Sequence, residues 1–243
     1  MSTPLIASIA IAPVDAVTAD ASGVQLGVLS LQGAFLEHCQ LLRACSGVAG
    51  VREVRTAAEL QGLDGLVLPG GESTAIVLIA EPSQPVGSTE QQGGMLEALR
   101  GWVRSGRATW GTCAGLILLS DRIEQTTSKS GGQTLVGGLD VTVSRNYFGR
   151  QLGSFEVRLP MPAVGDEPFP CVFIRAPALV AVGPGVEVLC SLEAHMAPPG
   201  STCTEPAVAV RQGALLGTAF HPELTTDVRL HQLFVDMARE RSH

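Results

Sequence analysis

Long apolar runs, basic charge and aromatic residues are all scarce in this sequence. No segment of the 243-residue chain approaches the run of about 18 apolar residues that a membrane-spanning helix needs. Sixteen basic residues stand against 23 acidic ones, a formal net charge of −7, which argues against a broad basic face for nucleic acid. Only 4% of the residues are aromatic, so a platform that stacks bases is also unexpected. We therefore expect neither a membrane nor a nucleic acid as a partner.

The cysteines show none of the spacings that bind metal. The sequence has no C-x-x-C pair, and no histidine lies at ligand spacing from a cysteine, so we predict no metal site. A chain of this length does not need disulfides for stability. We expect a reducing, cytoplasmic location and mostly buried thiols. The six cysteines are Cys39, Cys45, Cys113, Cys171, Cys190 and Cys203.

The N-terminal segment differs from the rest of the chain. Residues 1–23 contain no Lys or Arg, which excludes the basic region of a secretory signal and the arginines of a transit peptide. We predict a poorly ordered extension there. The whole chain is 45% hydrophobic and 16% charged, which excludes a disordered protein. We expect residues 24–243 to form a single domain with surface insertions near residues 81–94 and 193–205.

The first half of the chain repeats a strand–turn–helix rhythm four times. The predicted strands are residues 25–31, 51–55, 65–68 and 107–110, and the predicted helices are 34–45, 73–80, 95–104 and 116–124. Such a rhythm is typical of a parallel sheet that helices cover on both faces.

The second half reads as strands with turns between them. The predicted strands are residues 141–144, 154–159, 172–174, 186–189, 207–210 and 216–220, and an amphipathic helix at 226–241 closes the chain. We expect these strands to join the same sheet in antiparallel or mixed pairing. The predicted fold class is therefore a three-layer α/β/α domain with a mixed, mostly parallel sheet.

The strongest chemical signal is a cysteine between two glycines. The stretch Gly111-Thr-Cys-Ala-Gly115 has the G-x-nucleophile-x-G form of a nucleophile elbow, with Cys113 at the nucleophile position. The helix that follows would favour the thiolate, and the backbone N–H of Ala114 would face an oxyanion. The alternative is a buried cysteine in a Gly-rich turn.

A base for this cysteine is available near the C-terminus. His221 and Glu223 follow an apolar strand, and residues two apart in an extended segment face the same way. A cysteine nucleophile needs a base, and the base needs a group that orients it. The alternative is a solvated His in a turn. His38 and His231, inside predicted helices, are interpreted as structural or incidental, as are His195 and His243.

A third segment, Leu68-Pro-Gly-Gly-Glu-Ser-Thr74, places a glycine turn at the carboxyl end of a strand. Open α/β sheets bind ligands in such crevices. The backbone N–H of Gly71 is the candidate for a second oxyanion donor. The alternative is a plain turn with Ser73 as helix N-cap. No G-K-[ST] follows, so this is not a P-loop.

Taken together, these stretches resemble the class I, or triad, glutamine amidotransferases. More narrowly, the sequence resembles the PdxT/SNO family, the glutaminase subunits of pyridoxal 5′-phosphate synthase. The stretches that carry the resemblance are LSLQGAFLEH (29–38), LDGLVLPGGEST (63–74), WGTCAGLILL (110–119), SRNYFGRQLGSFE (144–156), VFIRAP (172–177) and TAFHPELTTDVRLHQLFV (218–235). The N-terminal extension and the two insertions exceed the family's compact pattern but leave these stretches intact.

The resemblance implies a flavodoxin-like fold and a role for each matching residue. Cys113 would be the nucleophile, His221 the general base and acid, and Glu223 the group that orients the imidazole. The residues that match the family's glutamine contacts are Gly71, Glu72, Ser73, Arg145, Ile174 and Arg175. An arginine there suits the α-carboxylate of glutamine, although a structural ion pair is the alternative for both arginines. Gln32 falls where the family meets its synthase partner, and its alternative is a simple turn residue.

The resemblance predicts an enzyme that hydrolyses L-glutamine through a γ-glutamyl thioester and passes ammonia to a separate synthase subunit for pyridoxal 5′-phosphate biosynthesis, with no cofactor of its own. The alternatives are an amidotransferase serving another synthase, a cysteine peptidase-like relative and a non-catalytic regulatory subunit. A peptidase would cleave a peptide reporter without a synthase. A regulatory subunit would not let a glutamine-like electrophile label Cys113.

Overall fold

The computed structural model describes residues 23–81, 94–124, 133–145, 147–148, 153–201 and 203–241. Residues 1–22 of the extension predicted at 1–23, and residues 82–93 of the insertion predicted near 81–94, lie outside these ranges. Within the described ranges, no helix is both long enough and apolar enough to cross a bilayer.

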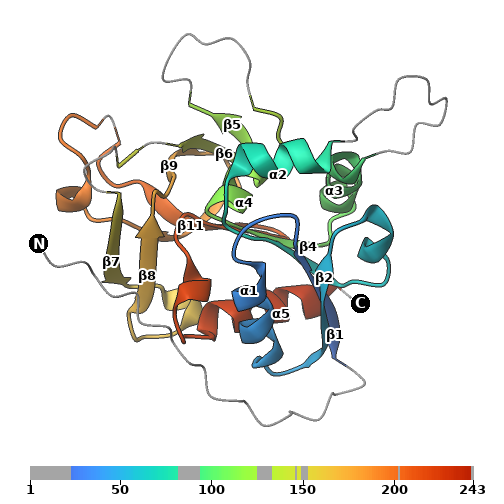
Figure 1. Cartoon of the computed structure of the whole chain (residues 1–243). Helices are drawn as coiled ribbons and strands as arrows, with labels where there is room; N and C mark the ends of the chain where they lie inside the picture. Colours follow the sequence, from blue (N-terminus) through green and yellow to red (C-terminus); the bar gives the residue numbers. More distant parts are fainter. Residues whose placement is uncertain are drawn as a thin grey trace, which may run out of the picture.

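A block of five parallel strands forms one half of the main sheet (Figure 1). The order is β2-β1-β3-β4-β12, and every neighbouring pair is parallel. The strands are β1 (Val24–Leu29), β2 (Val48–Val54), β3 (Gly65–Leu68), β4 (Ala108–Thr112) and β12 (Leu215–Thr218). All residues of β3, β4 and β12 are buried, as expected of strands that helices cover on both faces.

The other half of the main sheet is mostly antiparallel. It continues from β12 in the order β11-β9-β6-β5, and β10 pairs with β11 off this path. Only β5 and β6 are parallel here. The strands are β5 (Ser120–Ile123), β6 (Leu139–Ser144), β9 (Ala178–Val182), β10 (Glu187–Ser191) and β11 (Ala207–Gln212). The mixed sheet confirms the predicted fold class.

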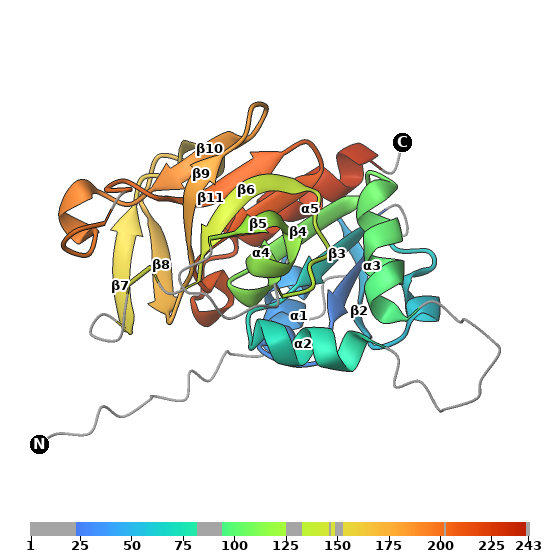
Figure 2. The ribbon, with the colours of Figure 1, turned by 90° about the horizontal axis from the view of Figure 1, so that it is seen from above.

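Two predicted strands do not join the main sheet, contrary to our expectation. β7 (Ser154–Leu159) and β8 (Phe169–Ile174) pair with each other as a separate antiparallel sheet. Buried residues alternate with more exposed ones in β8, and half-buried residues alternate with exposed ones in β7, which is the pattern of a hairpin that packs one face on a core. In Figure 2 this hairpin stands at one end of the molecule, away from β2 and α3.

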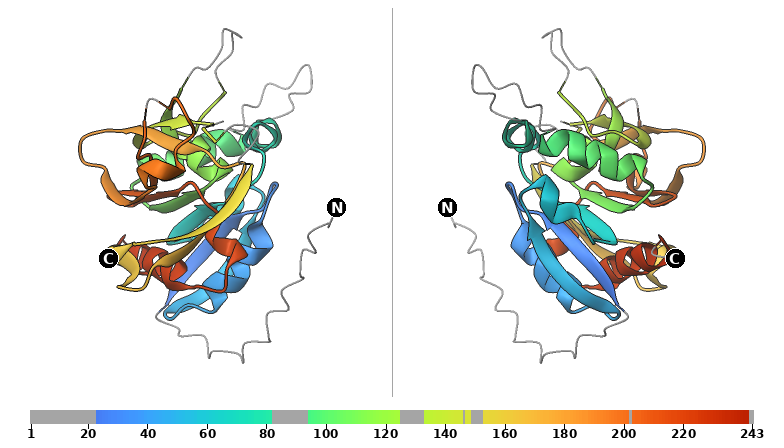
Figure 3. Two further views of the ribbon diagram at one scale, coloured as in Figure 1. Left: turned by 90° about the vertical axis from the view of Figure 1, so that its left-hand side faces the viewer. Right: turned by 90° about the vertical axis from the view of Figure 1, so that its right-hand side faces the viewer.

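Helices cover both faces of the main sheet, which gives the three layers (Figures 1 and 3). α1 (Phe35–Arg43) and α5 (Arg229–Arg241) pack together on one face. α2 (Ser73–Ala80), α3 (Met95–Arg104) and α4 (Ala114–Leu119) lie on the other. Short 3₁₀ turns among the described residues are η1 (Ala57–Leu60), η2 (Pro162–Val164), η3 (Ala194–Met196) and η4 (Pro222–Leu224).

The helix predicted at residues 116–124 is too long. It ends at Leu119, and residues 120–123 form the edge strand β5 instead. The Ser120 hydroxyl donates to the Ile117 carbonyl at 2.8 Å and closes the helix, and Arg122 pairs with Asp140 of the neighbouring β6 at 2.6 Å. Periodicity does not separate a buried helix from a strand over so short an apolar run.

Two smaller corrections concern the start of the last helix and a strand that was missed. The last helix begins at Arg229 rather than at residue 226, because the Asp227 carboxylate accepts the Arg229 backbone N–H at 3.1 Å and fixes the turn before it. β9 was not predicted, although its apolar residues pair with β6 and β11.

Candidate active site

Four neighbouring parallel strands end at one edge of the sheet and carry the residues singled out in the sequence. Gln32 follows β1, Gly71 follows β3, Cys113 follows β4 and His221 follows β12. These residues line one cleft of about 350 Å³, near the lower end of the range of about 300–1,000 Å³ for small-molecule sites. Ligands bind at the carboxyl ends of strands in open α/β sheets, and this cleft lies there.

Cys113 sits on a sharp turn between β4 and α4. Its backbone has φ 47° and ψ −102°, a conformation that an L-residue rarely adopts and that stores about 1–3 kcal/mol of strain. The turn is held because the Cys113 N–H donates to the Thr218 carbonyl of β12 at 2.8 Å. The side chain is buried, with 6% of its surface exposed at the cleft floor.

The two flanking glycines are needed for this turn. A Cβ on Gly111 would lie 2.5 Å from the Gly115 backbone, and a Cβ on Gly115 would overlap the Leu68 carbonyl of β3. The helix α4 therefore packs directly against strand backbones, which a side chain at either position would prevent. The predicted elbow is present in the structure.

His221 reaches Cys113 from the end of β12. The backbone N–H of His221 donates to the Val172 carbonyl of β8 at 2.8 Å, which fixes the backbone at this position. The Cys113 thiol and the His221 side chain line the same cleft and lie beside the same glycine, Gly70, and the thiol is close enough to raise the pKa of the imidazole. A Cβ on Gly70 would lie 2.8 Å from His221 Nδ1, so the glycine lets the ring lie flat against this turn.

Glu223 lies behind the imidazole, away from the cleft. Its Oε1 is 2.7 Å from His221 Nδ1, and its side chain is fully buried. A carboxylate only accepts hydrogen bonds, so Nδ1 carries the proton and Nε2 is left for Cys113. Cys113, His221 and Glu223 thus form one continuous chain of contacts.

The charged groups along this chain of contacts stabilise one another. Burial alone would lower the pKa of His221, but hydrogen bonds and negative charge from Cys113 and Glu223 raise it to about 10. Burial alone would raise the pKa of Glu223, and the adjacent His38 and His221 hold it well below its usual range instead. The imidazole is therefore a strong proton acceptor with an ionised partner.

The Gly-rich turn after β3 borders the cleft with backbone groups. Glu72, not Ser73, caps α2, because its carboxylate accepts the N–H groups of Thr74 and Ala75 at 3.3 and 2.8 Å. Ser73 is buried, and its hydroxyl donates to Gln133 Oε1 at 3.1 Å. Gly71 lines the same cleft as Ala114, the first residue of α4.

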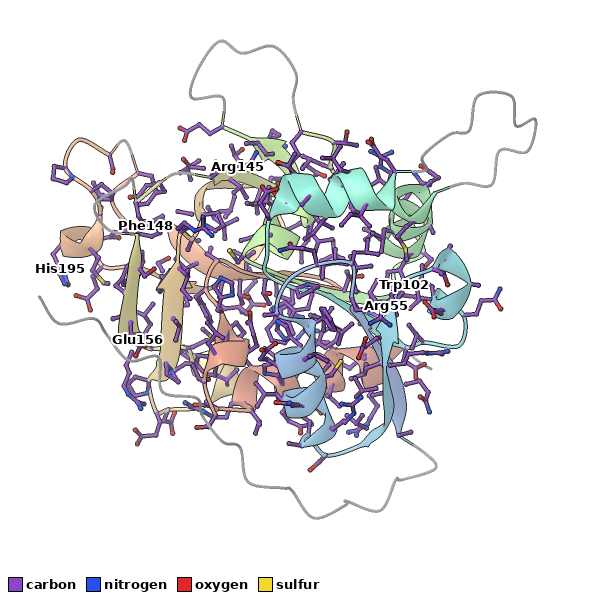
Figure 4. The ribbon with its side chains drawn as sticks, in the orientation of Figure 1. Arg55, Trp102, Arg145, Phe148, Glu156 and His195 are labelled. Atoms are coloured by element: carbon purple, nitrogen blue, oxygen red, sulfur yellow. The ribbon has the colours of Figure 1, made fainter. Side chains whose placement is uncertain are left out.

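Three further predicted residues approach the cleft from the second half of the chain. Arg145 follows β6 and lies 3.7 Å from Glu72, beside the start of α2 (Figure 4). Ile174 and Arg175 lie at the end of β8, both exposed, and Arg175 has a positive φ of 45°. The cleft therefore carries two cations and one carboxylate at its rim.

Gln32 lies inside the rim and contacts the Gly-rich turn. Its Oε1 accepts the Glu72 N–H at 2.7 Å, and a Cβ on Gly71 would overlap the same oxygen. The contact is one that a simple turn residue, the alternative named above, would also make, so it does not test the predicted contact of Gln32 with the synthase partner. Ile117 also lines the cleft and was not predicted.

The histidines interpreted as structural or incidental include two that are not on the surface. His38 and His231 are both fully buried, and His38 Nε2 lies 3.3 Å from Glu223 Oε2. Helical spacing could have shown this, since His38 lies three residues after Phe35 and four before Leu42 on the apolar side of α1. His195 is exposed, as expected, and His243 lies outside the described residues.

The comparison with protein families decides the class of the protein. A model of the SNO glutamine amidotransferase family matches residues 28–240. The chain belongs to the SNO glutamine amidotransferase family. This membership confirms the predicted class of enzyme, a glutamine-hydrolysing amidotransferase.

Relatives in this SNO glutamine amidotransferase family cover nearly the same length. Pyridoxal 5′-phosphate synthase subunit PdxT of Desulforudis audaxviator is 44% identical over 213 residues, which cover 88% of this chain and 98% of the relative. Probable pyridoxal 5′-phosphate synthase subunit PDX2 of Arabidopsis thaliana is 45% identical over 233 residues, which cover 88% of this chain and 86% of the relative. A crystal structure of a glutamine amidotransferase has a TM-score of 0.70 and 40% identity, with 88% and 98% of the two chains covered.

Proposed function

We propose that this chain hydrolyses L-glutamine to glutamate and ammonia with Cys113 as nucleophile, His221 as general base and acid, and Glu223 as the group that orients the imidazole. The observation that carries the proposal is the chain of contacts from the Cys113 thiol through His221 to Glu223 at the floor of one cleft. Nucleophile, base and orienting group within hydrogen-bond reach are what covalent catalysis requires.

The first half-reaction forms a thioester. His221 takes the thiol proton, and the Cys113 sulfur attacks the side-chain amide carbon of glutamine. The tetrahedral intermediate collapses as the C–N bond breaks, and His221 returns the proton to the leaving nitrogen, which departs as ammonia. In the second half-reaction, His221 activates a water that cleaves the C–S bond, releasing glutamate and the free thiol.

The oxyanion of both intermediates needs donors that are in place beforehand. The Ala114 N–H starts α4 and has no partner within the helix, as is usual in a first helical turn. Gly71, which follows β3, lines the same cleft. We assign both N–H groups to the oxyanion, a contribution of about 3–4 kcal/mol for a single donor in enzymes of this type.

The charges at the rim suit an amino acid. Arg145 and Arg175 provide cations for the α-carboxylate of glutamine, and Glu72 provides a carboxylate for its α-ammonium group. The amide end would then point toward Cys113, below the rim. Ser73 and Ile174 border this path and limit the shape of the substrate.

We infer that ammonia passes to a separate synthase subunit that makes pyridoxal 5′-phosphate. The printed names of the relatives, which are subunits of such a synthase, support this inference. Gln32 is the proposed contact with that subunit. Because Gln32 accepts the Glu72 N–H, a partner that moves Gln32 would also move the turn that carries Gly71.

The test is release of ammonia from glutamine, measured with and without the cognate synthase. We expect release to rise when the synthase is added and to vanish in the Cys113→Ala variant, while the circular dichroism spectrum is unchanged. Cys203→Ala, a partly exposed thiol outside the cleft, is the matched control and should keep full activity. Ammonia release that survives Cys113→Ala would remove Cys113 from the mechanism.

A further inference from the structure

The buried side of Glu223 faces two histidines that the proposed mechanism does not use. His38 comes from α1 and His231 from α5, the two helices that pack together on one face of the sheet (Figure 1). Both imidazoles are fully buried, and both pack edge-on against Trp110 of β4, with ring centroids 5.4 and 4.9 Å away. Burying polar or charged groups costs free energy unless they are paired, so two buried imidazoles beside a carboxylate must have a structural or functional reason.

The contacts form a line that continues the proposed triad into the core. Glu223 Oε1 meets His221 Nδ1 at 2.7 Å, and Glu223 Oε2 lies 3.3 Å from His38 Nε2. His38 Nδ1 is in turn 3.0 Å from His231 Nε2. Among the described residues, Glu223 Oε2 makes no hydrogen bond of good geometry, and His38 Nε2, at 3.3 Å, lies within ion-pair distance of it.

The protons in this line can be placed from the acceptor chemistry. Glu223 Oε2 only accepts, so His38 Nε2 must carry a hydrogen, which it shares with Thr112 Oγ1 at 3.3 Å. In neutral His38, Nδ1 then accepts from His231 Nε2–H. If His38 is charged, Nδ1 donates to His231 instead. In both cases His38 Nε2–H lies between Thr112 Oγ1 and Glu223 Oε2, each 3.3 Å from Nε2.

His231 stays neutral in either arrangement. Burial and the neighbouring His38 lower its pKa well below its usual value. Its other nitrogen, Nδ1, is buried without a hydrogen-bond partner in the described part of the chain. Such an unsatisfied nitrogen is tolerated only where other contacts hold the ring. His231 therefore serves to hold His38 in place.

We propose that His38, held by His231, is a positioning residue that fixes the Glu223 carboxylate so that Oε1 meets His221 and His221 Nε2 meets Cys113. This inference rests on the proposed roles of Cys113, His221 and Glu223. It assigns to α1 and α5 a share in catalysis, although neither helix touches the cleft through these histidines. Without His38, the carboxylate is free to rotate and its second oxygen has no donor.

The proposal also predicts a change in the pH profile. The titratable groups that face Glu223 are His221 on its own segment, His38 on α1 and His231 on α5, while Cys113 reaches it through His221. Burial raises the pKa of Glu223, and His38 and His221 oppose this effect. Loss of the His38 donor therefore raises the pKa of Glu223, and a protonated Glu223 no longer supports His221.

The sharpest test compares two amide substitutions at the same position. In His38→Gln the terminal amide overlays Nε2 and keeps a donor for Glu223. In His38→Asn it overlays Nδ1 and faces His231 only. Thr109→Val is the matched structural control, since Thr109 lies at the far end of β4 and its hydroxyl accepts a buried hydrogen bond from Trp102 Nε1 at 3.0 Å.

Two measurements separate positioning from mere stability. The first is kcat and KM for ammonia release by the complex with the cognate synthase, across pH. The second is the alkylation rate of Cys113 by iodoacetamide across pH, mapped by mass spectrometry, which needs neither glutamine nor the synthase. The second therefore tests His38 even if the proposed glutaminase role of Cys113 fails.

For His38→Asn we expect kcat to fall about 10- to 100-fold with KM nearly unchanged. The acid limb of both pH profiles should shift to higher pH by roughly one pH unit. His38→Gln should stay within a few-fold of wild type with the limb in place, and Thr109→Val should lower Tm only. The proposal is overturned if His38→Asn keeps wild-type kcat, or if it loses activity equally at every pH, as a purely structural change would.

Discussion

The replacement Glu223→Gln tests the buried carboxylate with almost no change of shape. The side chain is fully buried, and its Oε1 lies 2.7 Å from His221 Nδ1, so solvent cannot take over the role of the lost charge. The amide oxygen can still accept from Nδ1–H, but its NH₂ group then faces the Nε2–H of His38, donor against donor. The variant therefore loses the negative charge of Glu223. It also disrupts the alternation of hydrogen-bond donors and acceptors from His221 through residue 223 to His38.

The size of the effect follows from the coupling of the three groups. Negative charge from Glu223 is one of the two sources that raise the pKa of His221 to about 10. We expect that pKa to fall toward the ordinary value of 6.5 in the variant. In enzymes with a triad, a neutral amide in place of the acid lowers kcat by about 10⁴-fold. A range of about 10²- to 10⁴-fold is expected here, roughly 3–5 kcal/mol of transition-state stabilisation.

The assay is ammonia release by the complex with the cognate synthase, combined with an NMR titration of the histidines. Glu187→Gln, an exposed carboxylate on β10, is the matched control and should change neither reading. A kcat within about five-fold of wild type, together with an unchanged His221 titration, would refute the role of Glu223.

Other expectations concern the elbow, the rim and stability. Cys113→Gly should be about 1 kcal/mol more stable than Cys113→Ala in urea unfolding, because glycine accepts the positive φ; equal stabilities would argue against strain. Gly115→Ala should lower Tm sharply or prevent folding, since its Cβ overlaps the Leu68 carbonyl; a wild-type melting curve would contradict the packing. Arg145→Ala should raise KM for glutamine by roughly ten-fold or more with kcat less affected; an unchanged KM would exclude carboxylate pairing. The pKa of Glu223 is lower in the folded state than its ordinary 4.5, so its stabilising effect is present above pH 4.5 and lost below. The gap in unfolding free energy between wild type and Glu223→Gln should therefore shrink as pH falls from about 5 to 3.

The parallel half of the fold was predictable because its signals are local. β1, β3 and β4 are short apolar runs, each followed by a turn that contains glycine, and each leads into a helix. The positions of the site residues were predictable from the order of strands and turns. Neighbouring parallel strands end at one edge, so a cysteine after β4 and a histidine after β12 meet there.

The remaining errors arise where distant pairing decides the structure. Residues 120–123 directly follow the apolar run of α4 and carry no Gly or Pro that would end a helix, and they become a strand because β6 pairs with them. β7 and β8 look like sheet strands, but they pair with each other and leave the main sheet. The periodicity of each segment by itself predicts neither outcome.

The histidines show the same limit on the site. His38 and His231 are far apart in the chain, and their helices meet only because both cover the same face of the sheet. Spacing places His38 among the apolar residues of α1, but it does not reveal that Glu223 lies above it. The general expectation that polar residues are solvated does not hold for these two residues, which are fully buried.

The most direct test of the central claim is covalent labelling of the complex with an electrophilic analogue of glutamine, read by peptide mass mapping. The account predicts one equivalent of label on Cys113, protection by excess glutamine, and much slower labelling in His221→Ala. Label on another residue, or none on Cys113 with the synthase present, would contradict it.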